Sequence, residues 1–248
     1  MISKLAEFDG LYLRSRRFLV GVDEAGRGAL AGPVVAAAMS IPDAFYADLS
    51  LLNSIAALDD SKKLDSHTRA LLFEKFENLK RGGALDFEAQ SASVEEIEKL
   101  NILGATKLAM KRALEKLNAR GSLNLASSSA PATLFGEGLS DISRAEVLID
   151  GLKLKNFPFR HIALVKGDAQ SLAIAAASII AKVTRDRIME GLAPKYPRYG
   201  FELHKGYGTP AHLQNILIYG ACEIHRPSFL KKLRESEGAG KAKQGELF

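Results

Sequence analysis

Two adjacent carboxylates, Asp23 and Glu24, are the residues of this sequence best placed to do chemistry. They follow an apolar run, residues 18–22, that is typical of a buried strand, and they precede the glycine-flanked arginine Gly26-Arg27-Gly28. Neighbouring carboxylates repel each other and are normally solvated. Their position at a strand end therefore favours a divalent cation held between them. A tight turn between two strands is the alternative interpretation of the same stretch.

Two glycine-rich phosphate-binding motifs can be tested against this segment, and both fail. A phosphate loop requires Gly-x-x-x-x-Gly-Lys-[Ser/Thr]; Gly21 and Gly26 have the right spacing, but Arg27 follows in place of the lysine. A dinucleotide fingerprint requires Gly-x-Gly-x-x-Gly, and the third glycine, Gly32, comes one residue too late. The acids beside it would also repel a pyrophosphate.

Two further apolar runs lead to acids. Residues 147–149 precede Asp150, and residues 162–165 precede Asp168 by a short Lys-Gly turn. An acid at one strand end is usually a turn or cap residue, but three strand ends with the same pattern favour a common site. If the strands lie side by side, the four carboxylates converge. An all-oxygen cluster of this kind suits Mg²⁺ or Mn²⁺ rather than zinc.

Five segments together resemble the ribonuclease HII (type 2 ribonuclease H) family. They are GVDEAGRG (21–28), DSKKL (60–64), LIDG (148–151), KGDAQSLAIAAASIIAKVTRDRIM (166–189) and HKGYGT (204–209). They occur in the family's order and cover most of residues 20–229. The resemblance implies an α/β fold of ribonuclease-H-like type, a mixed central sheet flanked by helices with a small helical C-terminal portion.

The resemblance also implies an activity. Such an enzyme hydrolyses the RNA strand of RNA–DNA hybrids and cuts DNA duplexes 5′ to embedded ribonucleotides, leaving a 3′-hydroxyl and a 5′-phosphate. Asp23, Glu24, Asp150 and Asp168 match the family's catalytic acids, which would hold two Mn²⁺ or Mg²⁺ ions.

The remaining site residues are likewise carried over from the family. Gly26-Arg27-Gly28 matches the segment that reads the ribose, where a bare backbone can approach a 2′-hydroxyl closely. Tyr207 matches the tyrosine that packs on the sugar at the RNA–DNA junction, and Lys62 would contact a backbone phosphate.

Two other classes of function are weighed against this one. A nucleic-acid-binding protein on the same fold that has lost catalysis should lack at least one acid, whereas all four are present. A carboxylate-based phosphatase for small substrates would not need the glycine and tyrosine elements. It would also not need the basic balance of 34 Lys and Arg against 29 Asp and Glu, a net charge of +5.

Periodicity and turn residues predict the elements around the site. Strands are expected at 34–41 and 84–90, and a capping box at Ser93–Glu96 starts a helix that ends near Asn118. That helix is expected to bury a stripe of Ile97, Leu100, Leu103 or Gly104, Leu108 and Leu114.

Residues 121–143 read as a loop without assigned function. An alanine-rich helix from about Ala169 should press against the sheet with Asp168 at its N-terminus, and residues 185–187 should form a salt-bridged surface face. A loop at 199–209 and helices at 210–218 and 226–234 follow.

The chain of 248 residues is expected to form one catalytic domain, 18–230, with an N-terminal extension, 1–17, and a basic flexible tail, 231–248. The tail ends in Gln244-x-x-Leu247-Phe248, which resembles the peptides that dock bacterial replication and repair proteins on the sliding clamp; an inert tail is the alternative. No segment reads as a signal or membrane span, so a cytoplasmic protein is expected. A monomer is expected as well. Cys222 and the five histidines are interpreted as structural residues, without a zinc-type pairing.

Overall fold

The centre of the protein is a five-stranded mixed sheet. The computed structural model describes residues 3–13, 16–58, 64–121, 123–128 and 143–231. The strands are β1 (Phe18–Ala25), β2 (Val34–Pro42), β3 (Asp86–Ala92), β4 (Ala145–Asp150) and β5 (Ile162–Leu164), in the order β3-β2-β1-β4-β5. β1, β2 and β3 are antiparallel neighbours, whereas β4 and β5 run parallel to β1. The strands that end in acids therefore lie side by side.

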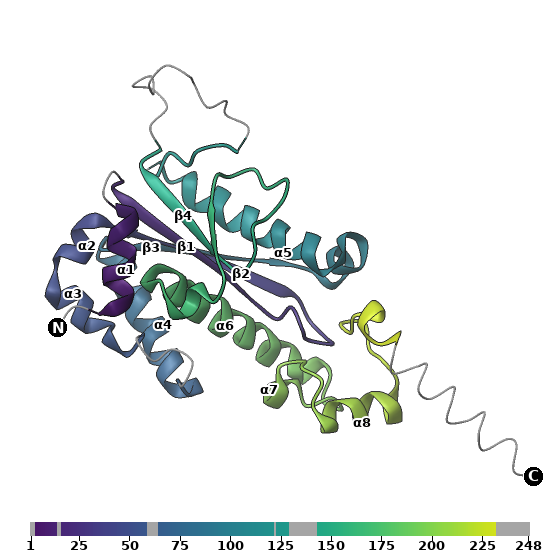
Figure 1. Ribbon diagram of the computed structural model, residues 1–248. Coiled ribbons are helices and arrows are strands. Elements are labelled where there is room, and N and C mark those ends of the chain that lie inside the picture. The colour runs from purple at the N-terminus through teal and green to yellow at the C-terminus, as the bar shows by residue number, and fades with distance from the viewer. Residues whose placement is uncertain (1–2, 14–15, 59–63, 122, 129–142, 232–248) are drawn as a thin grey trace, which may run out of the picture.

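Helices cover both faces of this sheet (Figure 1). They are α1 (Lys4–Leu13), α2 (Asp43–Ala47), α3 (Leu49–Ser54), α4 (Ser66–Arg81), α5 (Val94–Asn118), α6 (Leu172–Leu192), α7 (Phe201–His204) and α8 (Pro210–Tyr219). Helix α5 lies on one face, and α6 lies on the other together with α1 to α4. Helices α7 and α8 form a C-terminal portion beside the end of α6. The expected α/β architecture is confirmed.

Alternation along β1 divides the core into two halves. Leu19 packs in the cluster shared with α6, while Val20 and Val22 pack in the cluster shared with α5. This is the period-2 pattern of a strand whose two faces are both buried. Asp23 stands at the end of this buried strand and is itself only 7% exposed.

The alanine-rich helix presses closely on the sheet, as its composition predicts. A Cβ at Gly21 of β1 would overlap the backbone of Ala173 in α6, so only glycine allows this approach. The helix begins at Leu172, however, with Ser171 as its cap. Asp168 lies just before it, in the separate 3₁₀ turn Gly167–Ala169 that follows a left-handed Lys166. The expected position of Asp168 at the helix N-terminus is wrong by one turn.

Helix α5 has the predicted capping box, in which the Ser93 side chain accepts from the Glu96 N–H and the Glu96 side chain accepts from the Ser93 N–H. It is kinked at Asn101, whose φ is +57° and whose side chain caps the following turn. The kink changes the buried register, so Leu100 and Leu103 are exposed and their predicted burial is wrong. Ala105, Ala109, Met110 and Ala113 fill the core instead.

Other predicted boundaries shift slightly. The strand expected at 84–90 is β3, two residues later, because Gly82 and Gly83 first complete the turn after α4. The loop expected at 199–209 contains the short helix α7. Of the helix expected at 226–234, the described residues show a 3₁₀ turn at Pro227–Phe229, a bend at Leu230 and a helical Lys231, and the rest lies outside the described residues. The described part of the chain contains no helix both long enough and apolar enough to cross a membrane.

Three of the five histidines meet in the C-terminal portion. The rings of His204 and His212 stack at 4.2 Å, and His212 Nε2 lies 3.1 Å from His225 Nε2. Burial lowers the pKa of His212 and of His225 to about 4, so both are neutral near pH 7. His212 Nδ1 donates to the carbonyl oxygen of Tyr207 at 2.8 Å. These histidines are structural, as expected, and they support the segment that carries Tyr207.

Candidate active site

Strand order brings the four predicted acids to one edge of the sheet. Asp23 and Glu24 occupy the end of β1, and Asp150 ends β4, whose register places Ile149 beside Val22. Asp168 follows β5. The Gly167 N–H donates to Asp150 Oδ1 at 2.6 Å and so ties the turn carrying Asp168 to β4.

The carboxylates interact through their charges. Burial raises the pKa of Asp23 well above its usual value, and the neighbouring charges of Glu24 and Asp150 raise it further. Burial also raises the pKa of Glu24 and of Asp150; Asp150 contributes to the shift of Glu24, and Asp168 to that of Asp150. Asp150 is thus coupled to the other three acids. Such like-charge coupling in a partly buried place is typical of a functional site.

The donor set fits a hard divalent cation. Within the described residues, neither Asp23 nor Asp150 has a Lys, Arg or His within ion-pair distance, so their negative charges are not neutralised by the protein. No group of three His, Cys, Asp or Glu side chains in the described chain is arranged to hold a metal ion alone. Mg²⁺ commonly takes one or two carboxylates and completes its shell with water and substrate phosphate. The all-oxygen donor set therefore suits Mg²⁺ or Mn²⁺ better than a soft metal ion.

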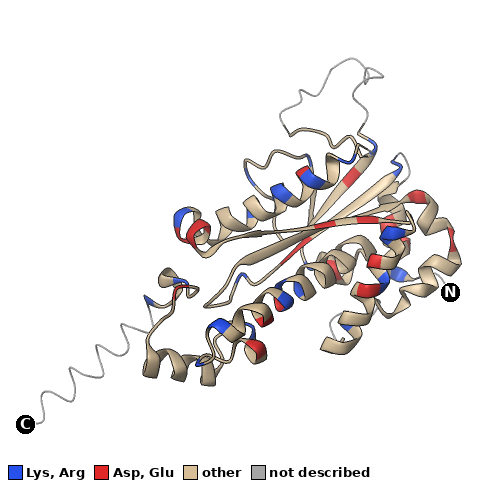
Figure 2. Cartoon of the chain, turned by 180° about the vertical axis from the view of Figure 1, so that it is seen from behind, with Lys and Arg blue, Asp and Glu red and all other residues tan. Residues whose placement is uncertain are grey.

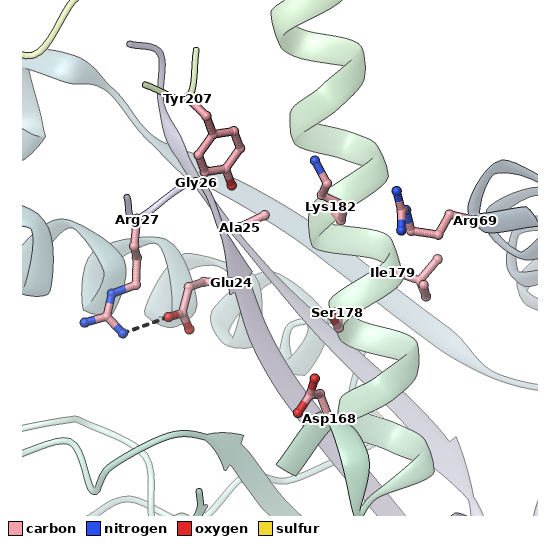
Figure 3. Close-up of a pocket in the computed structure, with 10 residues that line it drawn as sticks. All are labelled: Glu24, Ala25, Gly26, Arg27, Arg69, Asp168, Ser178, Ile179, Lys182 and Tyr207. Carbon is pink, nitrogen blue, oxygen red and sulfur yellow. Dashed lines mark hydrogen bonds and ion pairs between the residues drawn. The ribbon is translucent and has the colours of Figure 1, made fainter. Parts of the chain in front are cut away.

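A pocket of about 430 Å³ opens beside these acids (Figure 3). Glu24 and Asp168 line one end of it, and Tyr207 lies at the other, with Gly26 and Arg27 between them on the β1 side. The structure thus brings together five of the predicted site residues. Asp23 is not among the residues that line the pocket; it bonds to Ser178, which does line it, and its Oδ1 accepts from the Glu24 N–H at 2.7 Å.

Cationic groups line the sides of the pocket. Arg27 Nη1 forms an ion pair with Glu24 Oε1 at 2.9 Å. Across the pocket stand Lys182 of α6, which pairs with Asp186 at 2.7 Å, and Arg69 of α4. Lys182, Arg69 and Ser178 are pocket residues that no motif in the sequence indicates as part of the site. Arg69 is on α4, whereas Ser178 and Lys182 are on α6. The sequence does not indicate that they share a site, because the two helices come together only in the folded chain.

Ion pairs also engage basic side chains elsewhere in the described chain. Figure 2 shows basic segments on several helices, interleaved with acidic ones. On α5, Arg112 pairs with Glu96, and beyond its end Arg120 pairs with Asp86 and Glu88. Ion pairs thus engage cations both on α5 and in the pocket, and the pocket cations differ in lying beside the acids.

The prediction of a salt-bridged surface for residues 185–187 is wrong for Arg185. Its side chain is fully buried, whereas Asp186 pairs with Lys182 and Arg187 is exposed. The signal was present in the sequence, because Ala181 and Met189 lie one turn before and after Arg185 on the same helix face. Lys62, residues 129–142 and the tail with Gln244, Leu247 and Phe248 lie outside the described residues.

A mixed sheet that gathers acids from three parallel strands at one edge, beside a pocket suited to a nucleic-acid backbone, defines the ribonuclease-H-like class of nucleases. The family model for ribonuclease HII matches residues 20–232. The ribonuclease HII of Fusobacterium nucleatum is 44% identical over 229 residues, which are 92% of each chain, and that of Delftia acidovorans is 46% identical over 211 residues, 85% of this chain and 75% of the relative. The chain belongs to the ribonuclease HII family, and it is a ribonuclease H.

Solved structures agree with the fold. Ribonuclease H2 from Pyrococcus horikoshii has a TM-score of 0.61 at 26% identity, covering 88% of this chain and 98% of that one. Archaeoglobus fulgidus RNase HII, solved in a complex with PCNA, has a TM-score of 0.59 at 22% identity, covering 85% and 94%. The expectations of family, fold and ribonuclease H activity are confirmed.

Proposed function

We propose that this endonuclease is metal-dependent and that it cuts duplex DNA 5′ to embedded ribonucleotides as well as the RNA strand of hybrids. The observation that carries the proposal is the shared pocket. Glu24 and Asp168 lie at one end of it, Tyr207 at the other, and Gly26 and Arg27 between them. Carboxylates that can act on a phosphate thus stand beside elements that can recognise the sugar attached to it.

Asp23, Glu24, Asp150 and Asp168 would hold two Mg²⁺ or Mn²⁺ ions. When bound, such ions activate water and stabilise the leaving 3′-oxygen in an in-line displacement. The chain's part is to fix these carboxylates. β1 and β4 hold Asp23 and Asp150 in register, and the Gly167 N–H orients Asp150. The products would carry a 3′-hydroxyl and a 5′-phosphate.

Sugar recognition would come from the two elements opposite the acids. Among the backbone hydrogen bonds of the described residues, none is donated by the N–H of Gly26, Arg27 or Gly28. These groups are therefore available to a ribose and its phosphate. Tyr207 offers an aromatic face on which a sugar without a 2′-hydroxyl can pack. Arg27, Lys182 and Arg69 would contact the nucleic-acid backbone, and Lys62 is proposed to contact a backbone phosphate as well.

The proposal also covers the location, oligomeric state, domain organisation and partners of the protein. It comprises a cytoplasmic monomer that removes ribonucleotides during DNA replication and repair, with a catalytic domain at 18–230, an N-terminal extension and a tail that docks on the sliding clamp through Gln244, Leu247 and Phe248.

One cleavage experiment tests the proposed function. A DNA duplex with a single ribonucleotide is incubated with the protein and Mg²⁺, Mn²⁺ or a chelator, and the product ends are identified. We expect cleavage on the 5′ side of the ribonucleotide with either metal and none with the chelator. The same duplex with a 2′-O-methyl group at that position is the matched control and should remain intact. Metal-independent cleavage, or cleavage of the control, would contradict the proposal.

A further inference from the structure

Two arginines are buried beneath the loop that joins β1 to β2. Arg185 comes from α6 and Arg226 from the chain just before the last 3₁₀ turn, and both side chains have 0% exposure. Within the described residues, neither guanidinium lies within ion-pair distance of a carboxylate. Burial of a charge without a counter-ion is costly, so a chain that retains two such charges side by side gains something from them.

Both guanidinium groups bind carbonyl oxygens of this one loop. Arg185 donates from Nε to Pro33 at 3.0 Å and from Nη2 to Ala31 at 3.1 Å. Arg226 donates from Nε to Gly32 at 2.9 Å and from Nη1 to Arg27 at 3.0 Å. The backbone N–H of Arg226 also donates to the carbonyl of Leu30 at 2.8 Å. Five carbonyls between residues 27 and 33 are therefore turned toward the two arginines.

The same contacts shape the substrate side of the loop. Gly26 has a φ of +92°, and a Cβ at this position would overlap Arg185 Nε, which is itself held by Pro33. Arg185 therefore explains why this position must be glycine. The guanidinium carbon of Arg185 also lies 5.1 Å from the centre of the Tyr207 ring. One buried side chain thus supports both elements that face the sugar.

The two charges remain imperfectly compensated. Arg185 Nη1 and Arg226 Nη2 are buried without a hydrogen-bond partner in the structure. Burial lowers the pKa of Arg185, and burial together with the nearby Arg185 lowers the pKa of Arg226 to about 9. Near pH 7 both groups therefore carry positive charge behind a loop that faces an anionic substrate.

We propose that Arg185 and Arg226 are positioning residues for sugar recognition. They hold the carbonyls of residues 27–33 inward, leave the N–H groups of Gly26-Arg27-Gly28 free for the ribose and its phosphate, and support Tyr207. Arginine suits this task because its planar, always charged fork binds two carbonyls in a fixed geometry, which a lysine cannot do. The inference rests on the proposed cleavage at embedded ribonucleotides.

The test compares Arg185→Lys and Arg226→Lys with Arg187→Lys. Arg187 also lies on α6 and is exposed. Its guanidinium carbon lies 4.3 Å from the centre of the Phe73 ring rather than on the loop, so this residue is a matched control. Single-turnover cleavage is measured on a duplex with one ribonucleotide, and each rate is divided by the folded fraction from an unfolding curve. Amide exchange of residues 26–33 and affinity for an all-DNA duplex are measured in parallel.

We expect Arg185→Lys and Arg226→Lys, the two loop-supporting variants, to cut at the single ribonucleotide about a hundredfold more slowly per folded molecule. A displacement of groups that position the substrate has an effect of this size. Exchange should be faster in residues 26–33, affinity for plain DNA unchanged, and Arg187→Lys like the wild type. Wild-type rates in these two variants, or a loss of rate fully explained by unfolded protein, would overturn the positioning role of the two arginines. A wild type unable to cut at the ribonucleotide would instead contradict the proposed function.

Discussion

At the scale of single residues, the acids at the sheet edge oppose the stability of the fold. Asp23 is almost fully buried, lies beside two other carboxylates and has no cationic partner among the described residues. Burial of unneutralised charge destabilises a protein unless another group compensates it. The arrangement is understandable if the compensating charge arrives from outside the chain, which is the role proposed for the metal ions.

The first prediction concerns these acids. Asp23→Asn or Asp150→Asn should lower turnover about a thousandfold or more, because each removes a negative ligand from the phosphate-activating centre. Duplex binding should remain, because basic groups contribute most of it. Single-turnover cleavage and equilibrium titration with a labelled duplex measure the two effects. Asp43→Asn, at an exposed helix start, is the control. A variant that kept more than about a tenth of wild-type turnover would show that its carboxylate is not essential.

Tyr207 allows a prediction about specificity. Tyr207→Ala should slow cleavage at a lone ribonucleotide in DNA much more than cleavage within a continuous RNA–DNA hybrid, because only the former substrate requires the junction to be recognised. Tyr207→Phe keeps the aromatic face and should retain most of the discrimination. The measured quantity is the ratio of kcat/KM on the two substrates. Equal losses on both would mean that Tyr207 is a packing residue.

At the scale of elements, the buried Asp9 of α1 links this helix to the first turn of α6 by a hydrogen bond. Asp9 Oδ2 accepts from the Ala173 N–H in the first turn of α6 at 3.0 Å and from the Tyr46 hydroxyl at 2.8 Å. Burial raises the pKa of Asp9 to about 6, which outweighs these hydrogen bonds. The carboxylate thus positions the start of α6, and its ionised form is less stable in the folded than in the unfolded chain.

This contact predicts a dependence of stability on pH. Because the pKa of Asp9 in the folded chain, about 6, exceeds its ordinary 3.8, the folded state holds its proton more tightly between these values. The contribution of Asp9 to stability is therefore lost as pH rises from about 4 through about 6. Asp9→Asn cannot titrate, so its stability relative to the wild type should rise by roughly 3 kcal/mol between pH 4 and pH 8. Urea unfolding across this range measures the difference. Glu7→Gln on the same helix should show no such trend.

Local signals in the sequence were enough for most elements. The capping box at Ser93 and the apolar run before Asp23 depend on neighbouring residues and were predicted correctly. The kink at Asn101 is also local, a left-handed residue whose side chain caps the next turn, but the apolar pattern does not reveal it. The hydrogen bonds that hold the buried Arg185, by contrast, are made with partners far along the chain. Pro33, one such partner, lies 152 residues from Arg185. The convergence of the acids was predictable because parallel strands end at the same edge, whereas Lys182 and Arg69 belong to different helices whose approach no local pattern announces.

At the scale of the whole molecule, the acid-bearing edge of the sheet and the C-terminal portion are joined by hydrogen bonds and line one pocket. The N–H groups of Leu30 and Ala31 both donate to the carbonyl of Gly206, and Arg226 binds the same loop from the other side. The sheet therefore supplies the acids, and the C-terminal portion holds in place the loop and the tyrosine for which we propose contact with the sugar. Residues 232–248 follow this portion in the chain.

The last prediction concerns this tail. Gln244-x-x-Leu247-Phe248 follows a stretch of Gly, Ala and Lys, and two large apolar side chains after such a linker suit a peptide that fills a pocket on a partner. We expect the intact protein to bind the sliding clamp of its own organism with micromolar affinity, roughly −8 kcal/mol. Deletion of Leu247 and Phe248 should abolish this binding and leave cleavage of short duplexes unchanged, because neither residue is among those proposed to act on the substrate. Calorimetric titration of both forms against the clamp measures the effect. Absence of binding by the intact protein at tens of micromolar would leave the tail without this role and the nuclease unaffected.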